Sequence, residues 1–135
     1  MGTYAKGYRL EHRVQKLYTK YGWLATRFPK SGRRLYPADV FAIKRVGSKT
    51  HVHLVECKNA SKDNQEKKAI YIEAKQIQKL LKAANKHRAL AMIAYSFPHQ
   101  QARVIHVNRL RSSGKMLRIG REEGAPIKDF LETFV

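Results

Sequence analysis

Two short apolar segments carry the side chains best suited to chemistry. Residues 36–43 contain Asp39, and residues 52–58 contain Glu56 and Lys58. Both segments are rich in the residues typical of strands, and a polar Gly/Ser turn of hairpin length separates them. Antiparallel pairing brings Asp39 and Glu56 to the open end of the hairpin, and Lys58 shares a strand face with Glu56. Carboxylate oxygens are ligands that Mg²⁺ prefers, and a lysine ammonium suits a neighbouring phosphate.

A simpler interpretation treats these side chains as ordinary ion-pair partners at the ends of strands. The charge of the chain favours a functional interpretation over this one, because the formal net charge is +18 and the isoelectric point is about 10.3. Such an excess indicates a polyanionic partner, first nucleic acid and second an anionic membrane surface. The first three acids of the chain are Glu11, Asp39 and Glu56, and they lie among many more Lys and Arg residues. Carboxylates repel phosphate, so their presence there indicates a metal ion that neutralises them.

The length and composition indicate one domain, spanning residues 1–135 and large enough for a hydrophobic core. Cys57 is the only cysteine, so no internal disulfide can form. No apolar run approaches the roughly 20 residues of a transmembrane helix, and the first residues do not resemble a signal peptide. We therefore expect a cytoplasmic, nucleoid-associated protein without a membrane partner or a small-molecule cofactor.

Two predicted helices each carry an apolar stripe and a separate basic ridge. Apolar residues recur at helical spacing in residues 6–21 and again in residues 73–87. The cations of the first helix are Arg9, Arg13, Lys16 and Lys20, and those of the second are Lys75, Lys79, Lys82 and Lys86. Glu11 lies on the flank opposite the first ridge, where it can face the site of Asp39 and Glu56. Each ridge is either an ordinary solvated face or a surface that contacts a phosphate backbone.

The remaining segments predict strands before and after the second helix. The strand candidates outside the hairpin are residues 23–28, 70–72, 89–95 and 103–107. The run at 89–95 is apolar throughout, which indicates a strand covered on both faces. We expect a polar loop at 59–68 and a basic, irregular segment at 108–120. The order of elements predicts an α/β sandwich with a mixed central β-sheet of about five strands flanked by helices.

A loop at residues 29–34 leads directly to Asp39 and is rich in turn formers and cations. Ser31 is either a turn residue or a group that bonds a phosphate oxygen or holds a ligand. Lys30, Arg33 and Arg34 lie beside it, and the arginines can reach backbone phosphates.

The last residues predict a short helix with Pro126 at its first position. Its apolar stripe consists of Ile127, Phe130, Leu131 and Phe134. This stripe either completes the core or meets a partner subunit. Its terminal position and its two phenylalanines make it our candidate for a dimer surface.

The carboxylates belong to a wider pattern of short motifs. The segments that carry it are residues 7–11, 27–32, 37–39, 56–58 and 71–72, together with Gln76. Residues 37–39 and 56–58 match the PD-(D/E)xK nuclease signature, except that Ala38 stands where the signature has proline and Pro37 comes one place earlier. In order and length the whole set resembles the archaeal Holliday-junction resolvase family. The resemblance is strong from residue 6 to residue 94 and weak beyond.

The resemblance implies a restriction-endonuclease-like sandwich. It also implies a homodimer that binds four-way DNA junctions and cuts two opposing strands with Mg²⁺, for which Mn²⁺ substitutes. In this pattern Asp39 and Glu56 are metal ligands, Glu11 supports the metal or its water, Lys58 is the catalytic lysine, and Ser31 is a loop residue needed for cleavage. Arg9 and Arg27 match basic positions of the family and would hold the DNA. The further candidate DNA-binding residues of the sequence are Lys6, Arg13, Lys30, Arg33 and Arg34.

Two alternatives stay open on the sequence alone. One is a nuclease of the same fold that acts on duplex or flap DNA. The other is a DNA-binding protein whose nuclease fold is catalytically dead.

Overall fold

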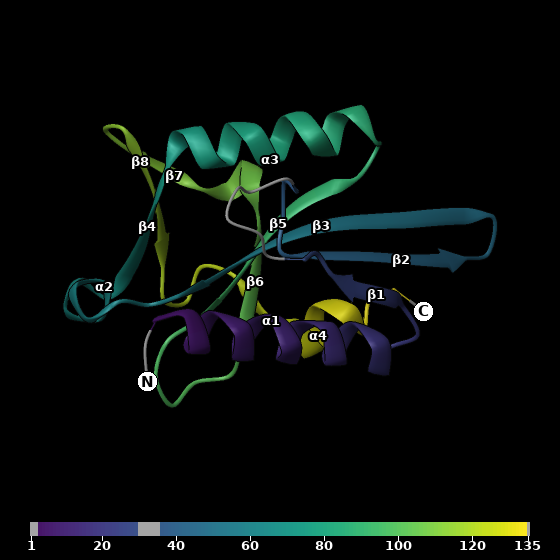
Figure 1. Cartoon of the computed structure of the whole chain (residues 1–135), viewed down its shortest axis with the longest axis horizontal. Helices are drawn as coiled ribbons and strands as arrows, with labels where there is room; N and C mark the ends of the chain where they lie inside the picture. Colours follow the sequence, from purple (N-terminus) through teal and green to yellow (C-terminus); the bar gives the residue numbers. More distant parts are fainter. Residues whose placement is uncertain (1–2, 30–35, 135) are drawn as a thin grey trace.

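The computed structural model describes residues 3–29 and 36–134, and within them the side chains of all but residues 3–8, 67, 112 and 113. The helices are α1 (Thr3–Lys20), α2 (Lys62–Lys67), α3 (Ala74–Lys86) and α4 (Ile127–Leu131), with a 3₁₀ turn at Val107–Arg109 (Figure 1). The strands are β1 (Leu24–Arg27), β2 (Val40–Val46), β3 (Lys49–Asn59), β4 (Ala69–Glu73), β5 (Leu90–Ser96), β6 (Arg103–His106), β7 (Arg111–Ser113), β8 (Met116–Gly120) and β9 (Ala125–Pro126). None of the described helices has the length and apolar character needed to cross a membrane.

The central sheet joins six strands of the described chain in the order β1-β2-β3-β5-β6-β9. β3 and β5 run parallel, and the other neighbours are antiparallel, so the sheet is mixed as predicted. The prediction of about five strands missed β9, which pairs with Arg103 and Val104. A strand of two residues shows no alternation that a sequence pattern can detect. The prediction that Pro126 is the first residue of the terminal helix is wrong by one position, because Pro126 is the N-cap of α4.

The hairpin of β2 and β3 confirms the predicted pairing but is longer than expected. β2 reaches Val46 and β3 begins at Lys49, so Gly47 and Ser48 alone make the turn. Gly47 has a φ of 62°, a conformation that glycine adopts without steric cost. The residues around the turn are exposed, and the tip projects from the rest of the molecule (Figure 1). Its polar strand residues therefore gave no apolar pattern.

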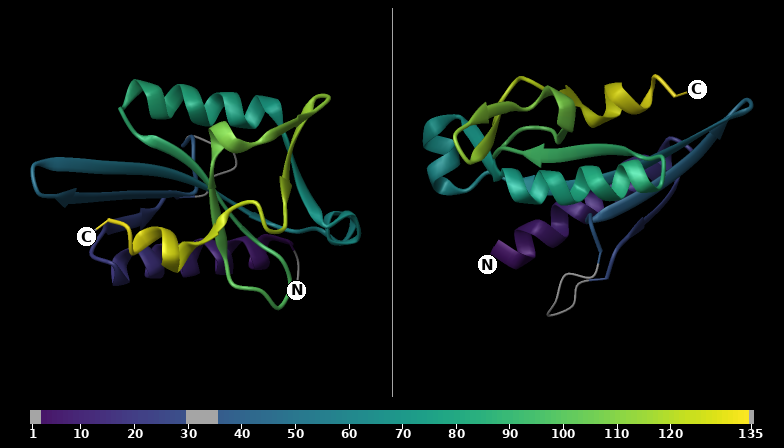
Figure 2. Two further views of the ribbon diagram at one scale, coloured as in Figure 1. Left: turned by 180° about the vertical axis from the view of Figure 1, so that it is seen from behind. Right: turned by 90° about the horizontal axis from the view of Figure 1, so that it is seen from above.

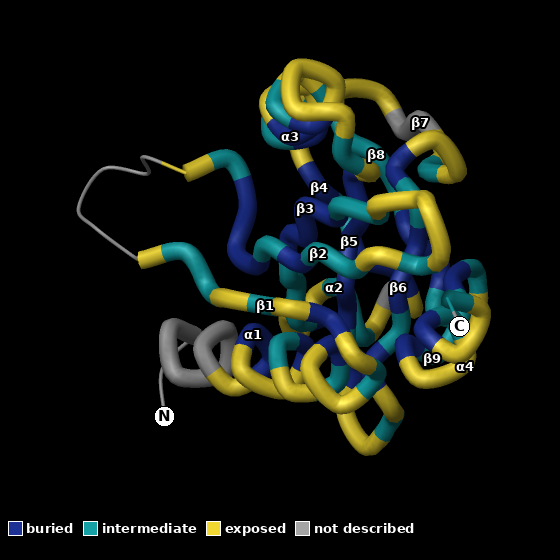
Figure 3. The backbone as a smooth tube through the Cα atoms, turned by 90° about the vertical axis from the view of Figure 1, so that its right-hand side faces the viewer, coloured by how far each residue is buried: buried dark blue, intermediate teal, exposed yellow. Residues whose placement is uncertain are grey.

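Helices cover both faces of the central sheet (Figures 1 and 2). α1 packs against the face that carries Val55 and Met92, whereas α3 packs against the face that carries Leu54 and Ile93. Successive residues of β3 thus enter opposite cores, as predicted for residues 52–58. Buried residues follow the strands between the two helices, and exposed residues lie on the outer turns of both helices (Figure 3).

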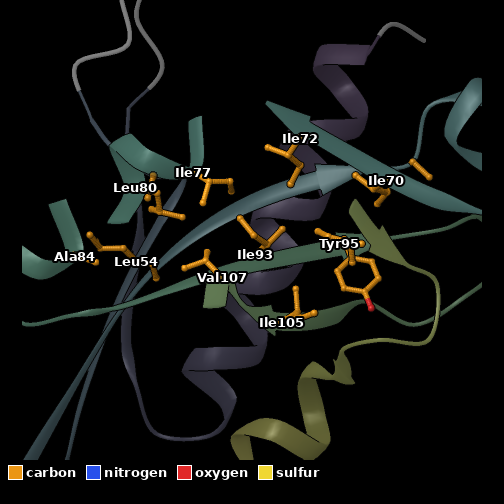
Figure 4. Close-up of a cluster of buried hydrophobic side chains, with 14 of the residues drawn as sticks. Leu54, Ile70, Ile72, Ile77, Leu80, Ala84, Ile93, Tyr95, Ile105 and Val107 are labelled. Atoms are coloured by element: carbon orange, nitrogen blue, oxygen red, sulfur yellow. The ribbon is translucent and has the colours of Figure 1, made fainter. Parts of the chain in front are cut away.

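The core on the α3 side also joins the central sheet to a second sheet of β4, β8 and β7 (Figure 4). Ile70 and Ile72 of β4 and Ile119 of β8 are at most 2% exposed. The expectation of an irregular segment at 108–120 is therefore wrong. The segment forms the hairpin of β7 and β8. Only one face of this hairpin lies in the core, so the segment has few apolar positions, and its many basic residues gave no strand pattern.

A helix also replaces the polar loop that was expected at residues 59–68. The hydroxyl of Ser61 accepts a hydrogen bond from the backbone N–H of Asn64 at 3.1 Å and caps the start of α2. Lys68, in a left-handed conformation with φ of 56°, ends it. The six residues of α2 are all polar, so they have no apolar stripe from which a helix could be predicted.

The terminal helix α4 belongs to the core of the chain. Ile127 and Leu131 are 1% and 0% exposed and pack in the same cluster as the apolar residues of α1. Phe130 and Phe134 contact each other edge to face, and the ring of Phe134 lies 5.3 Å from that of Trp23. The stripe therefore contributes to the core, and its role as a dimer surface stays a prediction for the half-buried Phe130 and Phe134.

A buried histidine lies at the centre of this aromatic cluster. The ring of His53 is 0% exposed and lies 4.5 Å from that of Trp23 and 5.3 Å from that of Phe134. Burial raises the pKa of Tyr18, so its hydroxyl stays protonated, and it shares a hydrogen bond of 2.8 Å with Nδ1 of His53. Among the described residues nothing bonds Nε2. Burial, together with the nearby His51 and His106, lowers the pKa of His53 to about 3.

We expect His53 to make the fold sensitive to acid. The unfolded chain takes up a proton near pH 6.5 and the folded chain only near 3, so stability falls as the pH drops through that window. The loss should approach about 1.4 kcal/mol per pH unit below about pH 6. The free energy of unfolding in urea is measured at pH 7 and pH 5 for the wild type, for His53→Gln and for the control His12→Gln, which changes an exposed histidine. The side chain of His53→Gln can still form a hydrogen bond with Tyr18, and this variant should lose less stability between the two pH values than the wild type and the control. An equal loss of stability in the wild type and in His53→Gln would rule this role out.

Candidate active site

The register of β2 and β3 places Asp39 beside Glu56. The last residue pair before the site is Val40 with Val55, and Asp39 and Glu56 come next in that register. The backbone N–H of Asp39 still donates to the carbonyl of Val55 at 3.0 Å. Each of the two acids is only 4% exposed. Burial of two adjacent carboxylates is costly unless cations or hydrogen-bond donors compensate their charges.

The two strands separate at this point, and the carboxylate of Asp39 lies at the fork. β2 begins at Val40, whereas β3 continues to Asn59 in parallel pairing with β5. Oδ2 of Asp39 accepts a hydrogen bond from the backbone N–H of Cys57 at 2.8 Å. A side-chain oxygen therefore takes the role that a neighbouring strand carbonyl has elsewhere in the ladder. This bond fixes the orientation of the Asp39 carboxylate next to the residue that follows Glu56.

Glu56 and Lys58 follow Leu54 on the β3 face that is covered by α3. Glu56 lines a cavity of about 500 Å³ together with Gln76 of α3. The other residues that line this cavity are Tyr36, Pro37, Lys79, Lys82, Ala83, Lys86 and His87. The possibility that Gln76 faces the site is thus confirmed. The presence of the α3 cations in the same cavity was not predicted, although Lys79 follows Gln76 by three positions, close to one helical turn.

Glu11 lies on the side of the central sheet that is opposite α3. It lies on α1, whose apolar residues pack on the Val55 face of the sheet, and it is 4% exposed. Burial agrees with the prediction that it turns inward, away from the ridge. Within residues 3–29 and 36–134, however, no three acids, histidines or cysteines come together as one metal-holding group. The pair that the register joins is Asp39 and Glu56.

The predicted DNA-binding residues lie in different parts of the chain. Arg9 and Arg13 are exposed on α1, together with Lys16 and Lys20, so the first ridge is a continuous outer surface. Arg27 ends β1 and is half-buried. The side chain of Lys6 and the whole of Lys30, Ser31, Arg33 and Arg34 lie outside the described residues.

Two stacked rings stand at the ends of the 29–35 segment. Phe28 and Tyr36 have ring centroids 4.8 Å apart and an interplanar angle of 8°. Tyr36 also lines the cavity of Glu56. The stack therefore ties the residues on either side of this segment to the rim of the cavity. Sequence reasoning missed it, because the two rings lie eight positions apart, with no helix or strand periodicity to link them.

Comparisons with known proteins identify the family of the chain and a shared fold. A family model described as archaeal Holliday junction resolvase (Hjc) matches residues 2–134. The solved Hjc of the archaeal hyperthermophile Archaeoglobus fulgidus, a Holliday junction resolvase, aligns with a TM-score of 0.75 and 22% identity over 93% of this chain and 99% of that one. D212, a nuclease from a fusselovirus, aligns with a TM-score of 0.62 and 9% identity over 99% and 93%. No curated protein sequence matches the chain.

Proposed function

The chain belongs to the archaeal Holliday junction resolvase (Hjc) family and is a junction-resolving nuclease, and we propose that Asp39 and Glu56 bind the divalent metal ion with which it cuts DNA. Nucleases of this kind depend on a metal. The observation that carries the proposal is the register that sets two buried carboxylates side by side at the fork of β2 and β3.

The donor set at the fork fits Mg²⁺, with Mn²⁺ as its substitute. Mg²⁺ binds through one or two carboxylates and keeps waters or substrate phosphate oxygens as its remaining ligands. Two carboxylates at the end of a strand pair, beside a cavity of about 500 Å³, suit that requirement. A metal bound there supplies Lewis acidity toward a phosphate oxygen and toward an attacking water.

The chain's own side chains complete the proposed mechanism. The hydrogen bond from Cys57 N–H holds the Asp39 carboxylate in one orientation. Lys58, two residues beyond Glu56 on the same strand face, orients the water or offsets charge on the pentavalent transition state. Glu11 supports the metal or its water from α1, and Ser31 contributes from the preceding loop.

We further propose that the enzyme acts as one nuclease domain per chain and as a homodimer on four-way junction DNA. The α1 ridge, defined as Arg9, Arg13, Lys16 and Lys20, holds the phosphate backbone, as do Lys6, Arg27, Lys30, Arg33 and Arg34. Two copies related by a two-fold axis present two sites to the two equivalent strands of a junction.

A comparison of substrates tests this function. With Mg²⁺, the wild type should cut a mobile four-way junction at paired positions in opposing strands and should leave a linear duplex of the same sequence intact. Without a divalent metal it should bind the junction and cut neither substrate. Equal cutting of junction and duplex would instead favour a nuclease for ordinary duplex or flaps.

A further inference from the structure

A second basic surface lies on the face of the sheet opposite α1. The α3 ridge, defined as Lys75, Lys79, Lys82 and Lys86, is exposed along its whole length. At about 1.5 Å per residue the eleven steps from first to last cover about 16 Å. That length corresponds to about five nucleotide steps of one strand at about 3.4 Å each. Within the described part of the chain none of these lysines forms an ion pair with a carboxylate, so their charges are available to an anionic partner.

The α3 ridge is connected to the proposed active site. Lys79, Lys82 and Lys86 line the same cavity as Glu56. A phosphate backbone bound along α3 therefore passes the mouth of the cavity in which the carboxylate lies. The cavity is within the size range of small-molecule sites, and a cationic wall favours the entry of phosphate. The α3 ridge is therefore part of the DNA path to the site.

The two ridges lie on helices that cover opposite faces of the central sheet, so we do not expect one straight duplex to lie along both ridges of a single chain. α1 packs on the Val55 face of the sheet and α3 on the Leu54 face, and the views of Figures 1 and 2 place the helices in separate layers. With about 10 Å per packed layer, the helix axes lie roughly 20 Å apart with the sheet between them. A four-way junction differs from a duplex in having arms that diverge from one point, and such arms can pass on both sides of the sheet.

We propose that the α1 ridge and the α3 ridge of one chain bind different arms of the same junction, and that this double contact underlies the selection of junctions over linear duplex. The proposal rests on the function proposed above and adds how the substrate is recognised. Once one arm is bound, binding of the second becomes intramolecular, so affinity rises only for a substrate that reaches both ridges. A linear duplex gains no such increase, because it occupies one ridge at a time.

Matched triple substitutions test the double contact. The α3 variant carries Lys79→Gln, Lys82→Gln and Lys86→Gln, and the α1 variant carries Arg13→Gln, Lys16→Gln and Lys20→Gln. A control variant of equal charge change carries Lys49→Gln, Lys62→Gln and Lys68→Gln, all exposed and outside both ridges. All positions are solvent-exposed, so circular dichroism should confirm an unchanged fold. Affinities for an immobile junction and for a linear duplex are then measured without divalent metal over a range of salt concentrations.

The expected signature is additivity on the junction and redundancy on the duplex. At about 0.9 per lost phosphate contact, each triple variant should lower the slope of log K against log salt by about 2.7 for each bound chain on the junction. Combining the two should double the loss. On the duplex each triple alone should change the slope by less than about 1, because the other ridge remains, and the control should change neither slope.

Two results would overturn the proposal. One is an unchanged junction slope in the α3 variant, and the other is a loss that adds on the duplex as it does on the junction. Cleavage by the wild type separates this inference from the proposed function. If the wild type fails to cut a mobile junction with Mg²⁺, the proposed function fails, whereas cutting combined with an insensitive α3 ridge refutes the double contact alone.

Discussion

Asp39→Asn and Glu56→Gln should each reduce junction cleavage by about a thousandfold and leave junction binding intact or stronger. Either change removes a charged metal ligand without adding bulk. A bound metal stabilises the transition state by several kcal/mol, and a loss of about 3–4 kcal/mol lowers the cleavage rate by two to three orders of magnitude. Binding should not suffer, because a neutral side chain no longer repels phosphate. The amide oxygen at position 39 can still accept from Cys57 N–H, so the fork of β2 and β3 should keep its shape.

Single-turnover cleavage and filter binding of the same junction measure the two effects separately. Glu66→Gln is the matched control, because it neutralises an exposed carboxylate on α2, outside the fork of β2 and β3. It should cut at the wild-type rate. Cleavage by Asp39→Asn or Glu56→Gln at the wild-type rate with Mg²⁺ would refute the assignment of the site.

A supercoiled plasmid with an extruded cruciform should be converted directly to linear product. One site per chain makes one nick at a time, and a single nick does not separate the junction into two duplexes. A two-fold dimer presents both sites to opposing strands within one complex. Both nicks should therefore follow within the lifetime of that complex, and little nicked circle should accumulate.

Light scattering at micromolar concentration completes this test. A monomer in solution together with accumulation of nicked circle would contradict the homodimer. Substitutions of Phe130 and Phe134 do not test the dimer interface cleanly, because both rings contact the cluster around Trp23 and His53. We expect Phe130→Asp and Phe134→Asp to destabilise the chain itself, so they are unsuitable as interface probes.

Strong periodicity made the layers that position the site predictable. The alternation along residues 52–58 separated Leu54 and Glu56 from Val55 and Cys57, and the structure places Leu54 in one core and Val55 in the other. The stripes of the first and second long helices likewise indicated which residues face inward. An element that buries a regular apolar face can be predicted, because its apolar residues recur in the sequence with the period of a helix or a strand.

Elements without such a face were missed. α2 is held by the Ser61 cap and has no apolar stripe, and β9 is two residues long. The terminal stripe predicted that four apolar residues share a helix face but not what covers them, and the helix ends at Leu131, before Phe134. The β2–β3 register could be anticipated, whereas the bond from Cys57 N–H to Asp39 depends on where the two strands separate, which is a tertiary property. The same holds for the cavity that brings α3 lysines to Glu56.

The central claim is that Asp39 and Glu56 together bind a divalent metal, and Mn²⁺ binding measured by electron paramagnetic resonance tests it most directly. The signal of free Mn²⁺ should fall further with the wild-type protein and an immobile junction than with the junction alone, whose phosphates also bind the ion. It should stay at the level of the junction alone with Asp39→Asn or Glu56→Gln, while Lys58→Met, which removes no ligand, should bind the ion as the wild type does. Mn²⁺ binding by both carboxylate variants with the affinity of the wild type would contradict the account.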